Sequence, residues 1–197
     1  SQIWEHKGNP AGQRLTANRT IESFYKWSGG GRIPIFCDTT SCTHTLLFET
    51  GGDILTPENR EKYKQLKIMD ITQWLKEVVL PRIKVIRPKN RILLHPTCSC
   101  QIMGLTPVLL DIARKCAREV ILPDNWGCCG ASGDRGFIFP ELSDSATRDE
   151  RDEIGHESFD GCYSLARTCE IAMQDHIEQP YESIVYLVDE TIQDQGT

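Results

Sequence analysis

Short apolar runs alternate with longer amphipathic segments along most of the chain. The run "RIPIF" (residues 32–36) is β-branched, and "RILLH" (91–95) and "EVILP" (119–123) have a similar character. Runs of this length are typical of buried strands. Between the first two, "ITQWLKEVVLPRI" predicts a helix that Pro81 ends, because its apolar residues fall at helical spacing: Ile71, Trp74, Leu75 and Val78.

Helical patterns follow each of the later runs. Thr106 is a suitable N-cap with Pro107 at the first helical position, and the apolar positions after it share one face: Leu109, Ile112, Ala113, Cys116 and Val120. The acidic stretch 143–154 predicts a solvated helix, and residues 168–177 predict a last helix with Cys169 in its first turn. The segment "ESIVYLVDETI" (182–192) predicts a strand that runs into a short helix.

Strands that alternate with helices at this spacing predict an α/β fold, a layered sheet with parallel strands. "RIPIF" and "RILLH" each lead into a Thr/Cys turn, "CDTTSC" and "PTCSC", which indicates two pseudo-repeat halves around one cysteine cluster. Residues 1–32 are polar and end in "SGGGR", so we expect a lead-in or linker there, irregular or helical, and one domain over 33–197. In such sheets the loops at the carboxyl ends of the strands build the site.

Composition excludes several function classes. The 197 residues are 39% hydrophobic and 25% charged, which is ordinary globular usage. A net charge of −6 argues against binding to nucleic acid or to an anionic membrane. Neither a membrane-spanning run nor a signal-peptide core is present, so we expect a cytoplasmic protein. The chain begins with Ser1, which indicates a piece of something longer.

Nine cysteines, without any CxxC pair, are the main chemical signal. An odd number in a chain of this size favours metal or redox work over a disulfide framework. Cys116, on an apolar helix face, and Cys37, at a strand end, are expected to be core residues. Four others occupy turns or helix starts, where a thiol is readily deprotonated and can bind metal: Cys98, Cys128, Cys129 and Cys169.

The adjacent pair in "WGCCGASGDRGF" (126–137) narrows the choice of metal. Zinc sites favour two to four residues between ligands, whereas an iron-sulfur cluster offers several irons a few ångströms apart. Three following glycines, Gly130, Gly133 and Gly136, indicate a backbone held close to something. A strained vicinal disulfide, or two unrelated core thiols, are the alternatives.

Three motifs together resemble the cysteine-rich CCG module at the carboxyl end of FAD-linked D-2-hydroxyacid dehydrogenases, of the D-lactate and D-2-hydroxyglutarate type. They are "HPTCSCQIMG", "CCGASGDRGFIFPEL" and "YSLARTCEIAM". The pattern is also similar to the B subunit of heterodisulfide reductase and to the iron-sulfur subunit of glycolate oxidase. The resemblance covers about residues 33–192.

The resemblance implies a module of an oxidoreductase that relays electrons through one [4Fe-4S]-type cluster, with Cys98, Cys128, Cys129 and Cys169 as ligands. FAD and the D-2-hydroxyacid would bind an upstream domain or subunit, so this chain alone would not be catalytic. It would lie in the cytoplasm, reaching the inner membrane only through partners. The final electron acceptor is not specified.

Some residues fit the resemblance less closely. The CxxC pair that closes the family's motif is absent here, because Ala166 occupies the position three residues before Cys169. Cys42 is a candidate additional ligand of the cluster, and Cys162 and Cys100 are weaker candidates.

Other polar residues are expected to support the site rather than to bind metal. Asp134 and Arg135 are expected to pair and lock the loop, and Arg135 is also a candidate to tune a cluster from nearby. His95 and His44 are interpreted as hydrogen-bonded neighbours. Two other functions stay open: a structural zinc or thiol docking module, and a thiol-disulfide redox protein that uses Cys128 and Cys129.

Overall fold

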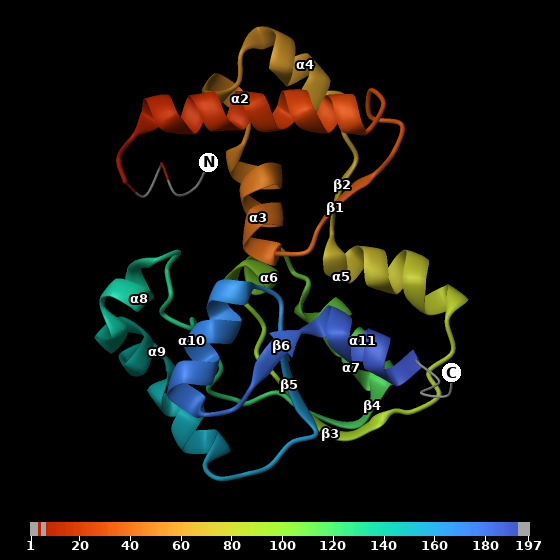
Figure 1. Ribbon diagram of the computed structural model, residues 1–197, viewed down its shortest axis with the longest axis vertical. Helices are drawn as coiled ribbons and strands as arrows, with labels where there is room; N and C mark the ends of the chain where they lie inside the picture. The colour runs from red at the N-terminus through yellow and green to blue at the C-terminus, as the bar shows by residue number, and fades with distance from the viewer. Residues whose placement is uncertain (1–3, 5–6, 193–197) are drawn as a thin grey trace. The chain divides into compact units, whose positions relative to one another are not determined.

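The computed structural model describes residue 4 and residues 7–192, and it divides into two compact units, Ser1–Ile71 and Thr72–Thr197 (Figure 1). The first residues of the predicted lead-in and the last five of the predicted domain lie outside the described residues. The predicted boundary after residue 32 falls inside the first unit. No described helix has the length and apolar character needed to cross a membrane.

The first unit begins with a long helix, α2 (Pro10–Trp27). Asn9 caps it, because its side-chain oxygen accepts a hydrogen bond of 2.9 Å from the backbone N–H of Gly12. The helix ends just before the triple glycine, whose members all have positive φ. A side chain on Gly31 would collide with the backbone carbonyl of Gln65, so a glycine is required there.

Two short parallel strands and several helical turns complete this unit. Strands β1 (Ile35–Cys37) and β2 (Ile68–Asp70) pair with Ile35 opposite Ile68. Between them come α3 (Thr40–His44), a π-helical turn (Thr45–Glu49), a 3-10 turn (Gly52–Ile54) and α4 (Pro57–Gln65). Ala17 and Ile21, on the buried side of α2, form a small core with Leu55.

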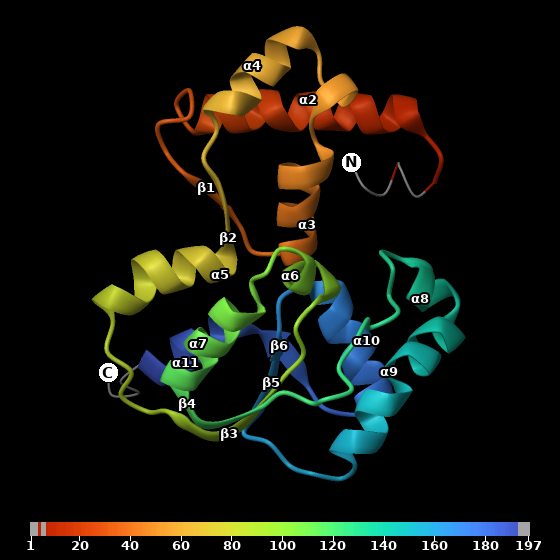
Figure 2. The same cartoon turned by 180° about the vertical axis from the view of Figure 1, so that it is seen from behind.

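The second unit is a four-stranded parallel sheet with helices on both faces (Figures 1 and 2). Its strands lie in the order β4-β3-β5-β6. The elements, in chain order, are α5 (Ile71–Trp74) with its continuation (Leu75–Val79 and Leu80–Arg82), β3 (Lys89–Leu94), α6 (Cys98–Ile102), α7 (Thr106–Cys116), β4 (Ala117–Ile121), α8 (Arg135–Ile138), α9 (Pro140–Ile154), β5 (Gly161–Ser164), α10 (Arg167–Ile177), β6 (Tyr181–Ser183) and α11 (Ile184–Ile192).

The direction in which successive strands are added to this sheet reverses at β3. Helix α7 carries it from β3 to the edge strand β4, and α8 and α9 carry it back across β3 to β5. Helices α7 and α11 pack together on one face, and α9 and α10 on the other (Figures 1 and 2). The loops after β3 and β5 therefore diverge at a topological switch point, where open α/β sheets commonly bind their ligands.

The α/β class with parallel strands, predicted from the sequence, is confirmed, and several details differ. Leu105, not Thr106, precedes α7, and Thr106 is its first residue. The acidic helix α9 is not solvated all round, because Thr147 and Glu150 on its inner side are buried. Most of the predicted last strand is helical, since β6 ends at Ser183.

Candidate functional site

The four cysteines predicted as ligands all follow strands of the second unit. Cys98 begins α6 just after β3, and Cys169 lies in the first turn of α10 after β5. Cys128 and Cys129 occupy the loop between β4 and α8. Because the strands are parallel, these three segments start from the same edge of the sheet.

The fold brings these four thiols into one hydrogen-bonded chain. Cys128 interacts with Cys98 on one side and with Cys129 on the other. Cys129 interacts in turn with Cys169. Three segments that are distant in sequence thus meet at their sulfur atoms.

The chain of thiols runs from the surface into the core. Cys98 and Cys128 are exposed, whereas Cys129 and Cys169 are buried among the side chains of the main core, with Leu93, Ala172 and Met173. All four are free thiols. One end of the site is therefore open to another molecule, and the other end is held rigidly by packing.

Cys128 is the most acidic member of the chain. Hydrogen bonds from the thiols of Cys129 and Cys98 lower its pKa, and the backbone N–H of Gly130 adds to the effect. The same contacts raise the pKa of the donors: the bond to Cys128 and then burial act on Cys98, and the bonds to Cys128 and Cys169 act on Cys129. Cys128 is thus the thiol that first presents a thiolate.

Glycines fix the loop that carries the adjacent pair. The N–H of Gly130 donates to the sulfur of Cys128 at 3.4 Å. Gly130 has a φ of +73°, and a Cβ on it would lie 2.6 Å from the Cα of Ser143 in α9. This position therefore admits only glycine, both for its backbone conformation and because α9 approaches so closely.

A buried histidine and a buried glutamate form a pair in the second unit. His95 directly follows β3, and its Nδ1 lies 2.9 Å and 3.1 Å from the two carboxylate oxygens of Glu150 in α9. Both side chains are almost wholly buried. His95 also contributes to lowering the pKa of Cys128, so it lies within electrostatic reach of that sulfur. The sequence placed His95 as a hydrogen-bonded neighbour but gave no sign of Glu150, which sits in a strongly acidic segment.

The four thiols are the side chains of this unit that could bind a metal ion or a cluster. Among the described residues, however, no group of three or more His, Cys, Asp or Glu side chains is arranged to hold a metal ion. The buried Nε2 of His95 has no hydrogen-bond partner.

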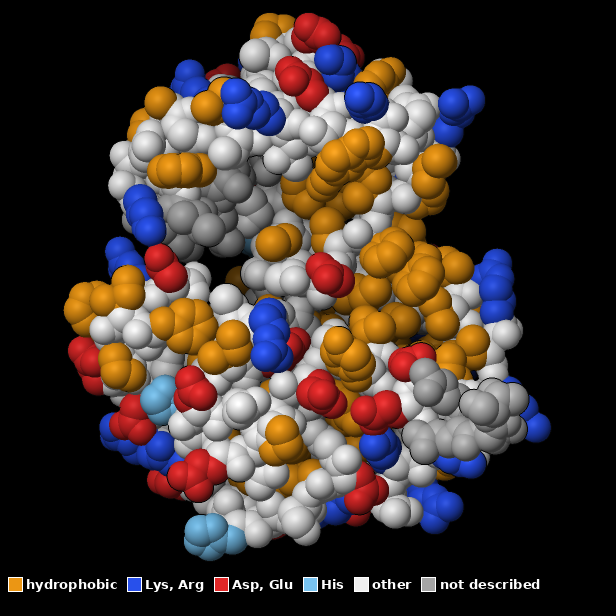
Figure 3. All heavy atoms as spheres, in the orientation of Figure 1, with side chains coloured by type: hydrophobic (Ala, Val, Ile, Leu, Met, Phe, Trp, Pro, Cys, Tyr) orange, Lys and Arg blue, Asp and Glu red, His pale blue; other side chains and the backbone are white. Residues whose placement is uncertain are grey.

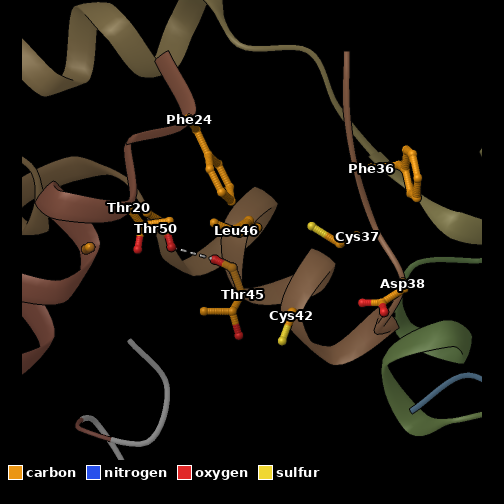
Figure 4. A pocket seen from close by; sticks show the side chains of 10 residues that line it. Thr20, Phe24, Phe36, Cys37, Asp38, Cys42, Thr45, Leu46 and Thr50 are labelled. Carbon is orange, nitrogen blue, oxygen red and sulfur yellow. Dashed lines mark hydrogen bonds between the residues drawn. The ribbon is translucent and has the colours of Figure 1, made fainter. Parts of the chain in front are cut away.

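Cys42, the candidate additional ligand, lies in the first unit with Cys37. Both line a cavity of about 430 Å³, and the residues around it are Ala17, Thr20, Phe24, Phe36, Asp38, Thr45, Leu46 and Thr50 (Figure 4). Burial raises the pKa of Cys37 to about 11 and also raises that of Cys42. Cys42 does not belong to the hydrogen-bonded chain of thiols in the second unit.

The remaining cysteines are core residues. Cys116 is fully buried, as predicted, and Cys100 and Cys162 are buried too. Cys162 lies in β5, where burial raises its pKa to about 12. Arg135 is exposed at the start of α8.

Comparison with known proteins adds no relative. No protein-family model matches the chain, and no curated protein matches it.

Proposed function

We propose that the chain is an electron-transfer module that holds one iron-sulfur cluster, of the [4Fe-4S] type, on Cys98, Cys128, Cys129 and Cys169. The observation that carries this proposal is the convergence of four thiols from three separate segments at one edge of the sheet. When bound, such a cluster accepts one electron at a time from a donor and passes it to an acceptor of higher potential.

The residues around the thiols suit this task. Packing of Cys129 and Cys169 in the core limits rearrangement when the charge changes. The N–H of Gly130 donates to the Cys128 sulfur, and a hydrogen bond of this kind stabilises added negative charge and raises the reduction potential. Exposure of Cys98 and Cys128 leaves a short route for electrons from a partner.

The donor that we propose is FAD on a separate domain or subunit of a D-2-hydroxyacid dehydrogenase. Oxidation of such an acid to the 2-oxoacid delivers two electrons to the flavin, and these would leave it singly through this chain. The motifs that surround the four cysteines support this finer assignment. The segment after the cysteine loop, from α8 into the first turn of α9, also offers a contact surface (Figure 3). Its exposed apolar side chains are Phe137, Ile138, Phe139 and Leu142.

Two other functions would use the same thiols. A structural zinc site is disfavoured because Cys128 and Cys129 are adjacent in sequence, whereas zinc sites favour two to four residues between ligands. A thiol-disulfide enzyme is favoured by one observation, the lowered pKa of Cys128 beside a second thiol. In that case Cys128 and Cys129 would be oxidised to a disulfide as an external disulfide is reduced to two thiols.

Anaerobic reconstitution separates the three functions. The chain would be incubated with ferrous iron and sulfide, desalted, and analysed for iron, acid-labile sulfide, zinc and visible absorption. We expect several irons and a similar number of sulfides per chain, with broad brown absorption. Zinc alone, or a colourless protein that reduces disulfides, would instead support one of the alternatives and overturn the cluster.

A further inference from the structure

The cavity in the first unit, of about 430 Å³, has no part in the proposed electron transfer. Its lining comes from α2, from the end of β1, and from α3 and the π-helical turn that follows it. Phe24 of α2 points towards Leu46 of that turn, and Cys37 of β1 lies on another side (Figure 4). Cavities of this size are typical of sites that bind small molecules.

The lining is largely apolar and carries no basic side chain. Carbon and sulfur surface comes from six described residues: Ala17, Phe24, Phe36, Cys37, Cys42 and Leu46. Sulfur packs favourably against aromatic rings. None of the described lining residues is Lys, Arg or His, and the exposed Asp38 is the only acid among them. An anionic ligand would therefore lack a counter-charge and meet a carboxylate, whereas a neutral aromatic ligand matches the lining.

Three threonines supply polar groups to the lining, and only Thr45 among these three has a hydroxyl without a partner. The hydroxyl of Thr20 donates to the carbonyl of Thr16 at 2.9 Å, and the hydroxyl of Thr50 donates to the carbonyl of Thr45, also at 2.9 Å (Figure 4). Thr45 is only 6% exposed, and its Oγ1 makes no hydrogen bond with a described residue. A buried hydroxyl left unpaired costs about 1 to 3 kcal/mol. A ligand that brings an acceptor would remove this cost.

The backbone at Thr45 is fully engaged, unlike its side chain. Thr45 is the first residue of the π-helical turn, and its carbonyl accepts from both the N–H and the hydroxyl of Thr50, at 2.9 Å each. Turns of this kind are rare in proteins and are frequent at functional sites. The turn is thus held closed by its own backbone, and the Thr45 hydroxyl is left for another molecule.

We propose that this cavity binds a neutral, flat aromatic molecule with a carbonyl oxygen, and that the hydroxyl of Thr45 donates a hydrogen bond to that oxygen. The aromatic part would pack against Phe24 and Leu46. The inference goes beyond the function proposed above and does not depend on it, because every described lining residue belongs to the first unit and the four thiols belong to the second.

The test uses prodan, a neutral naphthalene ketone whose fluorescence rises and shifts to the blue in apolar surroundings. We expect saturable binding to the full chain. The affinity should be at least about tenfold higher than that of anilinonaphthalene sulfonate, an anion with similar rings, because Asp38 disfavours negative charge. Thr20→Phe, which adds a ring to the lining, should abolish the binding of prodan.

Variants at Thr45 test the hydrogen bond. Thr45→Val removes the hydroxyl and keeps the shape, so the affinity for prodan should fall by about three- to tenfold, the effect of one hydrogen bond. Thr45→Ser keeps the hydroxyl and should keep the affinity. Thr16→Val is the matched control, because the Thr16 hydroxyl donates to the carbonyl of Gly12 and lies outside the described lining. This variant should bind prodan like the wild type.

Each contrary result overturns a stated part of the proposal. A wild type that binds no prodan, or binds the anion equally well, overturns the ligand class. Undiminished binding in folded Thr20→Phe would place the probe on another surface and overturn the site. Equal affinities of folded Thr45→Val and the wild type would overturn the hydrogen bond. If Thr45→Val does not fold, dimethylaminonaphthalene, which lacks the ketone, should bind the wild type more weakly than prodan, and equal binding would overturn the hydrogen bond instead.

Discussion

The thiol of Cys129 is hydrogen-bonded to the thiol of Cys169, although 39 residues lie between them in the chain. Helices α8 and α9 and strand β5 fill that interval and return the chain to the same edge of the sheet. The pair is buried with Leu93 and Met173, so the core itself determines the distance between two of the proposed ligands.

Replacement of a proposed ligand should remove iron without unfolding the protein. Cys129→Ser changes one atom in a buried position, and we expect the reconstituted chain to lose most of its iron and sulfide. Cys162→Ser is the matched control, because Cys162 is equally buried in the same core but lies outside the chain of thiols. Iron quantitation beside circular dichroism checks both, and full iron content in folded Cys129→Ser would contradict the assignment.

Gly130→Ala should destabilise the chain more than Gly133→Ala. Both residues have positive φ, which costs an alanine roughly 1–2 kcal/mol. Only at Gly130 would the new Cβ also meet the backbone of Ser143, whereas Gly133 has open space around it. Because both variants have the cost of positive φ, the difference between their free energies of unfolding, measured in urea, gives the cost of the contact with α9 alone. Equal values for the two variants would show that α9 does not pack there.

Leu93→Ala should lower the free energy of unfolding of the chain and weaken the packing around Cys129 and Cys169. Leu93 is fully buried next to Cys129 and Cys169, and the loss of such a side chain costs about 2 to 5 kcal/mol. Ile102→Ala, at a side chain that is 69% exposed, should change stability by less than about 0.5 kcal/mol. Urea unfolding of the metal-free chains measures both, and a Leu93→Ala cost as small as that of Ile102→Ala would argue against the described core.

The stability of the loop before the cysteines should depend on the ionisation of Glu153. Its carboxylate accepts hydrogen bonds from the backbone N–H groups of Asn125 and Asp124, at 2.8 Å and 2.7 Å, and these bonds lower its pKa below the ordinary 4.5. Because the folded pKa is lowered, the stabilisation is complete above pH 4.5 and is lost as the pH falls through the folded value.

Glu153→Gln should therefore lower the melting temperature at pH 7 by a small amount, and the difference from the wild type should shrink at pH 3. Asp149→Asn, at an exposed acid of the same helix, is the control. A Glu153→Gln effect that stays constant between pH 7 and pH 3 would rule out the ionised carboxylate as its origin.

Cys128 should be the first thiol to react in the reduced, metal-free chain. Its pKa is lowered by hydrogen bonds from Cys129 and Cys98, whereas burial raises the pKa of Cys42, which is also exposed. Since the thiolate is the nucleophile, alkylation of Cys128 by iodoacetamide at pH 6 should be at least about tenfold faster than that of Cys42. Mass spectrometry of the peptides gives both rates. The Cys42 rate should also climb steeply towards pH 9 while the Cys128 rate stays nearly flat, and parallel profiles would refute the lowered pKa.

The sequence alone predicted the α/β class, strands at 32–36, 91–95 and 119–123 close to the observed β1, β3 and β4, helices close to the observed α5, α7, α9, α10 and α11, and the four cysteines at strand ends or helix starts. These features follow from the local spacing of apolar residues and from turn residues, both of which can be read directly from the sequence. It missed β5, because "GCYS" is too short and too polar to indicate a strand, although the sheet buries it on both faces.

Only the tertiary structure decided which polar groups meet. His95 and Glu150 are 55 residues apart, and Glu150 is one acid among many in its helix. Its burial against the histidine depends on how α9 packs on the sheet. The same packing joins the thiols, since long-range contacts follow from the strand order β4-β3-β5-β6 and not from any local pattern.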